Sequence, residues 1–366
     1  MNQTTYNLNE NGEKMRLKQY AIALASLLLT CNIAMAQQVA SVIILMDKHI
    51  TPQQITGAGS TFGGPIYAKW AENAKSQGIE LNYQNIGSGG GINQVTNRTV
   101  DFGGTDMPLS AEKLTESKLV QFPTVIGGVV IIVNIPGIQA NTLRLTGETL
   151  SDIYLGKITK WNDNAIKILN PMLDLPSLPI AVVYRADGSG TTYVFTNYLS
   201  GKSVEWKNTV GNSTSVKWSV GNGAKGSDGV AATVKHVKGA IGYVESAYAA
   251  TNKLTTTLLK NKAGNYVEPS FAAFSAAAAN ADWEHVDNFA VNLNDQTGEI
   301  SWPIESATFV LIPLNPVKPE IGVAVRKFFD YSFKTGSDIA KNMQYVPLPV
   351  VVQDSIRNSW SKQFSN

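Results

Sequence analysis

Three glycine-rich turns stand ahead of predicted helices. They cover residues 57–62 (GAGSTF), 87–91 (GSGGG) and 185–191 (RADGSGT). Glycine lets the backbone come close to a ligand, and the free N–H groups at a helix start point outward, where the helix dipole favours negative charge. The chemistry that these turns could perform is therefore the binding of an anion.

Polar side chains within the turns support this interpretation. Arg185 offers a planar fork of donors that matches phosphate or carboxylate, and Asp187 could either hold that fork through a salt bridge or cap the following helix. A serine or threonine at a helix start is often only an N-cap, so one such turn alone indicates little. Three turns together, one with an arginine, favour an oxyanion site. The hydroxyls that could donate there belong to Ser60, Thr61, Ser88, Ser189 and Thr191.

The better-known phosphate motifs are not met. A dinucleotide fingerprint would need glycine where Phe62 and Ile92 stand, and no G-x-x-x-x-G-K-[ST] pattern occurs. Residues 221–229 (GNGAKGSDG) are also glycine-rich, and we interpret them as a solvated loop.

Catalytic and metal sites are not indicated either. Ser189 lacks the glycine that a nucleophile elbow requires two residues earlier, because Asp187 stands there. The three histidines, His49, His236 and His285, show no metal-ligand spacing, and His236 is expected at the surface. We therefore expect no enzymatic activity, no metal and no cofactor.

The elements that must position these turns follow an α/β pattern. From residue 55 onward, short β-branched runs alternate with amphipathic helical stretches. The predicted strands cover residues 81–86, 125–135, 180–184 and 307–312, and the predicted helices cover residues 65–77, 92–98, 191–199, 271–281 and 321–334.

A late strand and helix after a long middle region predict a chain that leaves one lobe, builds a second and returns. We expect lobe 1 to comprise residues 55–130 and 303–366, and lobe 2 to comprise residues 131–302. Residues 37–54 form a leader to which no structure is assigned.

The first 36 residues have the features of an export signal. A basic pair precedes an apolar run at residues 20–29, which is too short to span a bilayer, and a small-x-small pattern ends at Ala36. We expect cleavage after Ala36 and a periplasmic mature chain. Either Met1 or Met15 could begin this signal, because the residues between them have no signal-like pattern.

The mature chain is nearly neutral and has no cysteine, because Cys31 lies within the signal. Subtracting the three basic and two acidic residues of the signal from 30 and 28 leaves 27 basic and 26 acidic residues. No basic run suggests a nucleic-acid surface. An anion must therefore be held by local groups rather than by a large positive field.

Over these residues the chain resembles the PstS family, the periplasmic phosphate-binding proteins of bacterial ABC phosphate importers. The matching stretches, in the family's order, are ITGAGSTF (55–62), YAKW (67–70), NYQNIGSGGG (82–91), TVDFGGTDMPLS (99–110), QFPTVIGGVV (121–130), IYLGKITKWND (153–163), RADGSGTTYVFTNYL (185–199) and GAIGYVE (239–245). The resemblance implies a two-lobe α/β fold of the type II periplasmic binding proteins, with phosphate in the cleft between the lobes.

The resemblance also implies a set of ligand residues. It comprises Thr61, Phe62 (through its backbone N–H), Ser88, Asp106, Arg185, Ser189, Gly190 and Thr191. Asp187 matches the acid that pairs with the binding arginine. Two departures are visible: Ser60 replaces a family alanine beside the first donor, and residues 37–54 have no counterpart in the family.

Asp106 is the most informative member of this set. A carboxylate in an anion site is repulsive unless the anion carries a proton to donate. Phosphate keeps such a proton near neutral pH and sulfate does not, so an acceptor here predicts selection of phosphate. On sequence pattern alone, Asp106 could also be a turn or cap residue ahead of Met107.

The function implied is capture of inorganic phosphate and delivery to inner-membrane ABC permease subunits, by a monomer that does not bind nucleic acid. One alternative is a binder of another tetrahedral oxyanion, such as sulfate or molybdate, which a site with donors only would favour. A second is a secreted phosphatase on the same scaffold, which would need a nucleophile with a base or a metal. A third is a phosphate-scavenging surface protein without a transporter.

Overall fold

The computed structural model describes residues 52–283 and 285–364, together with the single positions 15, 35 and 38. Almost all of the predicted export signal and leader therefore lies outside the described residues, as do Cys31 and His49. The elements below belong to the compact unit Gln53–Asn366.

A mixed β-sheet runs through this unit. Its strands are hydrogen-bonded in the order β2-β1-β3-β12-β4-β8-β6-β7, and β13 and β9 also pair with β4. Their bounds are β1 (Gln53–Gly59), β2 (Ile79–Asn85), β3 (Phe102–Thr105), β4 (Leu119–Val133), β6 (Ala181–Arg185), β7 (Asn222–Ala224), β8 (Ala240–Glu245), β9 (Thr255–Thr256), β12 (Glu305–Pro313) and β13 (Val346–Pro347). A separate three-stranded sheet contains β11 (Tyr266–Val267), β10 (Leu258–Lys260) and β5 (Arg144–Leu145).

The long strand β4 joins the two halves of the sheet. All 15 of its residues are buried, as its continuous apolar sequence predicts for a strand covered on both faces. Up to Gly128 it pairs with β12, and from Val129 to Val133 it pairs with β8. The partner of β4 therefore changes at one point in the middle of the strand.

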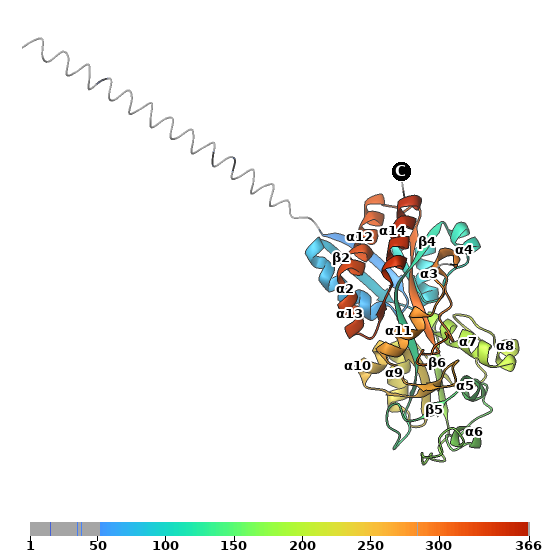
Figure 1. Ribbon diagram of the computed structural model, residues 1–366. Coiled ribbons are helices and arrows are strands. Elements are labelled where there is room, and N and C mark those ends of the chain that lie inside the picture. The colour runs from blue at the N-terminus through green and yellow to red at the C-terminus, as the bar shows by residue number, and fades with distance from the viewer. Residues whose placement is uncertain (1–14, 16–34, 36–37, 39–51, 284, 365–366) are drawn as a thin grey trace, which may run out of the picture. The chain divides into compact units, whose positions relative to one another are not determined.

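Helices cover both halves. The β2-β1-β3-β12 half carries α2 (Gly64–Ala74), α3 (Ser88–Thr96), α4 (Ala111–Ser117), α12 (Pro319–Thr335), α13 (Ser337–Asn342) and α14 (Val350–Gln363). The remainder carries α5 (Gly147–Tyr154), α6 (Asn164–Lys167), α7 (Gly190–Lys202), α8 (Val204–Thr209), α9 (Gly226–His236), α10 (Ser246–Asn252) and α11 (Phe271–Ala279). Figure 1 shows the C-terminal helix α12 beside the N-terminal elements β1 and α2, so the chain returns to its starting half. No helix in the described part of the chain is long and apolar enough to span a membrane.

Every strand and helix predicted above is present, with shifts at the ends. The helix expected at residues 92–98 begins earlier, at Ser88, and the helix expected at residue 191 begins at Gly190. In both cases the glycine turn itself forms the first helical turn. The N–H groups of the turn therefore have no acceptor within their own helix, and those of Gly89 and Gly190 donate instead to Gly188 O and Ser88 Oγ.

The prediction of a solvated loop over residues 221–229 is wrong about the loop, although residues 221–223, 225 and 228 are exposed. These residues form β7 and the first turn of α9, and Ser227 is buried. Their small side chains allow β7 to pair with β6 and allow the helix start to pack closely. Glycine content alone does not distinguish such a helix start from an exposed loop.

Phe329 of α12 joins the elements of the N-terminal half. Its ring lies 5.7 Å from that of Tyr67, 5.3 Å from that of Phe102 and 5.4 Å from that of Phe122, in edge-to-face arrangements between ring centroids. These partners come from α2, β3 and β4. The side chain is completely buried, so it anchors the returning helix to the sheet.

We expect Phe329→Ala to lower the free energy of unfolding by about 3–5 kcal/mol, because it removes buried area and leaves a cavity. Urea unfolding followed by circular dichroism measures this loss. Val350→Ala is the control, since Val350 is 69 % exposed and should change stability by only about 0.5 kcal/mol or less. Equal effects of the two substitutions would contradict the anchoring role of Phe329.

Candidate functional site

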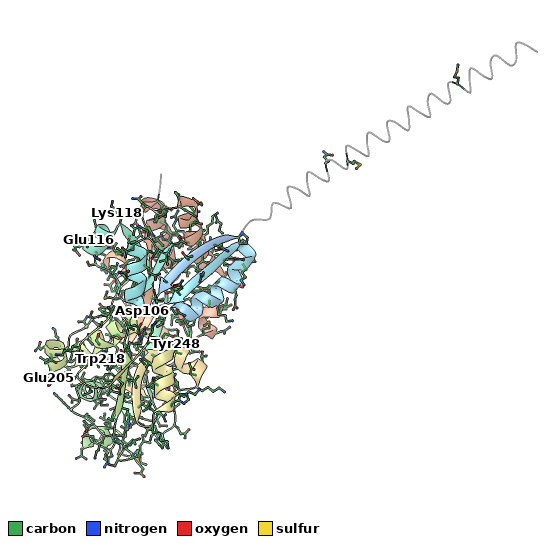
Figure 2. The ribbon with its side chains drawn as sticks, turned by 180° about the vertical axis from the view of Figure 1, so that it is seen from behind. Asp106, Glu116, Lys118, Glu205, Trp218 and Tyr248 are labelled. Carbon is green, nitrogen blue, oxygen red and sulfur yellow. The ribbon has the colours of Figure 1, made fainter. Side chains whose placement is uncertain are left out.

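Five segments that are distant in the sequence meet around Asp106. They are the turn after β1, the start of α3, the residue after β3, the β6–α7 turn and the start of α9. Figure 2 shows Asp106 and Tyr248 near each other at this meeting point. All the residues predicted for the ligand set are buried, and Asp187 is half-buried.

Arg185, the last residue of β6, is held by Asp187. Its Nε donates to Asp187 Oδ1 at 2.8 Å and its Nη2 to Oδ2 at 2.5 Å, so the expected ion pair is present and bidentate. The backbone N–H of Gly226 also donates to Asp187 Oδ1, at 2.9 Å. Burial pushes the pKa of Asp187 upward, but the hydrogen bonds and charge of Arg185 outweigh it and hold the pKa below its usual value.

The free end of the Arg185 guanidinium faces two hydroxyls. Nη1 donates to Thr61 Oγ1 at 3.1 Å and to Ser227 Oγ at 3.2 Å, and the two hydroxyls lie 2.8 Å apart. Ser227 is a member of this cluster that sequence reasoning missed. A signal for it existed, because a hydroxyl residue after glycine at a helix start is the pattern of the three recognised turns.

Asp106 follows β3 and is 1 % exposed. Ser60 Oγ donates to its Oδ1 at 2.6 Å, whereas Ser88 Oγ lies 3.5 Å from its Oδ2. Burial raises the pKa of Asp106 to about 6, against the lowering effects of the Ser60 hydrogen bond, the Thr308 side chain and the Arg185 charge. Its two oxygens are thus unequal, and Oδ2 has the weaker partner.

The start of α7 approaches Asp106 from the other side. The Gly190 N–H donates to Ser88 Oγ at 3.0 Å, and a β-carbon at position 190 would lie 2.6 Å from Asp106 Oδ2. Only glycine therefore fits this approach. Ser189 caps the helix by accepting from the Thr192 N–H at 3.1 Å, and Thr191 Oγ1 is buried with no hydrogen-bond partner within the described residues.

Three tyrosines bind the backbone carbonyls of the turn after β1. Tyr83, Tyr248 and Tyr345 donate their phenol protons to the carbonyls of residues 60, 61 and 62, at 3.0, 3.0 and 2.6 Å. These residues come from β2, α10 and the segment before β13, and sequence reasoning missed all of them. These hydrogen bonds fix the backbone of residues 60–62 through its carbonyl groups. The side chains and N–H groups of the turn are thereby held in position.

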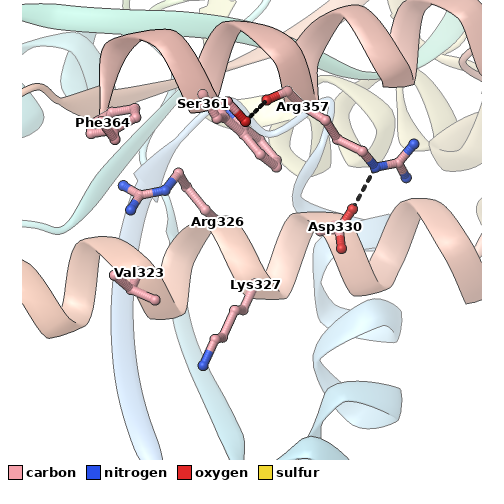
Figure 3. Close-up of a pocket in the computed structure, with 8 residues that line it drawn as sticks. Val323, Arg326, Lys327, Asp330, Arg357, Ser361 and Phe364 are labelled. Atoms are coloured by element: carbon pink, nitrogen blue, oxygen red, sulfur yellow. Dashed lines mark hydrogen bonds and ion pairs between the residues drawn. The ribbon is translucent and has the colours of Figure 1, made fainter. Parts of the chain in front are cut away.

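A cavity of about 500 Å³ lies elsewhere, between α12 and α14 (Figure 3). Arg326, Asp330 and Trp360 line it, and none of the residues predicted for the site does. An ion pair of 2.7 Å between Arg357 Nε and Asp330 Oδ1 borders it. Within the described residues, no three His, Cys, Asp or Glu side chains are grouped as a metal ion would require.

The cluster around Asp106 combines many donors with one acceptor. The donors are the Arg185 Nη1 group, the N–H groups of Phe62 and Gly190, and the hydroxyls of Thr61, Ser88, Thr191 and Ser227. Such an arrangement is suited to a small oxyanion that carries a proton of its own.

Comparison with known proteins first defines the class. A family described as "PBP superfamily domain" matches residues 47–333. Among solved structures, a periplasmic phosphate-binding protein, PfluDING, has a TM-score of 0.69 at 23 % identity and covers 84 % of this chain and 94 % of its own. A phosphate-binding protein from Stenotrophomonas maltophilia has a TM-score of 0.61 at 20 % identity, covering 84 % and 93 %. The described unit has the two-lobe α/β fold of these periplasmic binding proteins.

Relatives with higher identity define the family. The "Phosphate-binding protein PstS" of Pasteurella multocida is 52 % identical over 312 residues, which are 85 % of this chain and 91 % of the relative. The protein of the same name from Haemophilus influenzae is 49 % identical, over 84 % of this chain and 93 % of its own. The chain belongs to the PstS family of binding proteins.

Glu245 is a buried acid directly behind the site. It ends β8, caps α10 by accepting from the Ala247 N–H, and has no partner for Oε2 within the described residues. Burial raises the pKa of Glu245 to about 8. Between pH 4.5 and 8 the folded protein therefore binds a proton that the unfolded chain releases, and this contribution to stability is lost as the pH rises.

In the parent, the free energy of unfolding should fall as the pH rises from 5 to 8, because Glu245 loses its proton. Glu245→Gln cannot titrate, so we expect the variant to become more stable relative to the parent over this range. The gain should approach 1.4 kcal/mol per pH unit at most. Urea unfolding at a series of pH values measures it, with Glu80→Gln as control because Glu80 is exposed. Parallel profiles of the parent and Glu245→Gln would show that Glu245 does not titrate in this range.

Proposed function

We propose that this chain captures inorganic phosphate in the periplasm and delivers it to the inner-membrane permease of an ABC importer. The observation that carries the proposal is the buried carboxylate of Asp106, surrounded by donors from helix starts and Arg185. Membership of the PstS family supports it, since the relatives are named as phosphate-binding proteins. The proposed action is binding and release, without bond breaking.

The proposed phosphate ligands are Thr61, Phe62 (backbone), Ser88, Asp106, Arg185, Ser189, Gly190 and Thr191, with Asp187 and Ser60 as supporting residues. Their burial and their convergence from separate segments support this set. Ser189 can accept from the Thr192 N–H as a cap and still donate its own proton to phosphate. We add Ser227, because its hydroxyl faces the same end of Arg185 as that of Thr61.

The proposed selection of phosphate over sulfate follows from Asp106, the acceptor of the cluster. A phosphate oxygen that carries a proton can donate to Asp106 Oδ2, the carboxylate oxygen with the weaker partner. Sulfate has no such proton and would place negative charge against an unpaired carboxylate, at a cost of about 2–5 kcal/mol in a dry site. A site for sulfate or molybdate would be better served by donors only. A phosphatase is disfavoured because the relatives are named as binding proteins.

The proposed lobes are residues 55–130 with 303–366, and residues 131–302. The change of partner along β4 after Gly128 and the start of β12 at Glu305 support these crossing points. The ion would enter between open lobes, exchange water for amide, hydroxyl and guanidinium donors, and be buried on closure. The contacts of Arg185 with Thr61 and of Gly190 with Ser88 would be among those made as the lobes close.

The proposed location follows from the predicted export signal, cut after Ala36, which leaves a monomer in the periplasm. The description of a similar solved structure as a periplasmic phosphate-binding protein supports this location. The partners are inorganic phosphate and the permease subunits, and nucleic acid is not one of them.

We expect Asp106→Asn to reduce the preference for phosphate over sulfate by ~30-fold or more, because an amide can donate to sulfate where a carboxylate repels it. Titration calorimetry of both anions at pH 8 measures the ratio. Asp174→Asn is the control, since Asp174 is exposed and lies outside the site. An unchanged ratio in Asp106→Asn would remove the acceptor role from Asp106.

We expect Gly190→Ala to weaken phosphate binding by ~10- to 100-fold, since its methyl group would lie 2.5 Å from Ser88 Oγ and 2.6 Å from Asp106 Oδ2. Gly201→Ala is a matched control in the same helix, because a β-carbon there meets nothing within 4 Å. Calorimetry gives the affinities, and circular dichroism checks that both variants fold. Equal affinities of the two variants would place the ligand away from the start of α7.

A further inference from the structure

Ser60 is held in one orientation next to Asp106. Its N–H donates to the Gly104 carbonyl at 2.9 Å, and its own carbonyl accepts from Tyr83 at 3.0 Å. Its Oγ accepts from the Phe62 N–H at 3.0 Å and donates to Asp106 Oδ1 at 2.6 Å. A hydroxyl has one proton, and Asp106 is the partner of Oγ that can accept it, so the proton of Ser60 points at Asp106 whether the Phe62 N–H donates to Oγ or to phosphate.

This contact gives the two carboxylate oxygens of Asp106 different roles. Oδ1 is engaged by a short, charge-assisted hydrogen bond, which favours the ionised form. Oδ2, with Ser88 Oγ at 3.5 Å and Gly190 beside it, is the oxygen that faces the start of α7. A proton taken up by Asp106 would go to Oδ2, and the carboxyl would then be a donor to the anion.

Thr308 also lowers the pKa of Asp106, but its Oγ1 has no hydrogen-bond partner within the described residues, so it does not replace this contact. The charged and titratable groups that face Asp106 do not replace it either. Arg185 is the cation acting on it, and its guanidinium is already paired with Asp187. The phenols that face it are those of Tyr67, Tyr83, Tyr248 and Tyr345, from α2, β2, α10 and the segment before β13. Burial raises the pKa of each of these phenols, so all four stay neutral and add no charge beside Asp106.

We propose that Ser60 is a positioning residue for anion selection: it keeps Asp106 an acceptor and thereby sets how acidic the solution must become before the site admits sulfate. The inference rests on the proposed phosphate function and names the residue that regulates it. Burial already brings the pKa of Asp106 to about 6, and the hydrogen bond from Ser60 opposes any further rise. We call the pH at which sulfate affinity begins to increase the crossover. Loss of the Ser60 hydroxyl would move this crossover to higher pH.

The test is calorimetry of the full mature chain with phosphate and with sulfate from pH 4.5 to 8.5. In the parent, sulfate affinity should increase as the pH falls through the pKa of Asp106. In Ser60→Ala the same increase should begin about one pH unit higher, so that sulfate binds ~3-fold more tightly than in the parent at pH 6.5 and ~10-fold more tightly near pH 8. Ser306→Ala is the matched control, because Ser306 donates to the backbone carbonyl of Asp106, at 3.3 Å, and not to its carboxylate.

Ser60→Cys provides a second variant of similar size, whose weaker S–H donor should give a crossover between those of the parent and Ser60→Ala. This graded order keeps the test decisive if Ser60→Ala folds poorly. Coincident crossovers in the parent and the Ser60 variants, or equal shifts in the Ser60 and Ser306 variants, would overturn the role of Ser60. Failure of the parent to bind phosphate, or an unchanged anion ratio in Asp106→Asn, would instead overturn the proposed function.

Discussion

A buried carboxylate next to the proposed anion site is unfavourable for two reasons, lost hydration and repulsion of the ligand, and the groups around Asp106 offset both. Ser60 supplies a short hydrogen bond to one oxygen, and Ser88 lies near the other. The mature chain is almost neutral, so no broad positive field offsets the repulsion. Selection and binding must both come from groups within a few ångströms, and this explains why so many donors from separate segments converge here.

The single cation of the cluster is itself restrained. Asp187 binds two of the three guanidinium nitrogens of Arg185, and the Gly226 N–H binds Asp187 in turn. A planar guanidinium held in this way presents one edge and loses little rotational freedom when a ligand arrives. The same ion pair joins the end of β6 to the start of α9, so the charge and the helix that carries Ser227 are positioned together.

The continuous strand β4 links the chemistry to the proposed closure. It belongs to both halves of the sheet and is buried along its whole length, and the site residues come from elements on either side of it. Much of this framework could be predicted from the sequence, because apolar runs and helical periodicity are local signals. The order of the strands could not, since it depends on which distant segments pair, as when β12 inserts between β3 and β4.

The sequence by itself determined the parts of the site that are local: the glycine turns at helix starts, and the pairing of Arg185 with an acid two residues away. The importance of Asp106 came from family resemblance rather than from its neighbours in the chain. Only the tertiary structure decided that residues 221–229 enter the site through Ser227 and that Ser60 donates to Asp106, 46 residues away. Local patterns follow from backbone sterics and burial, whereas contacts of this kind exist only once the strands have taken their order and brought the turns together.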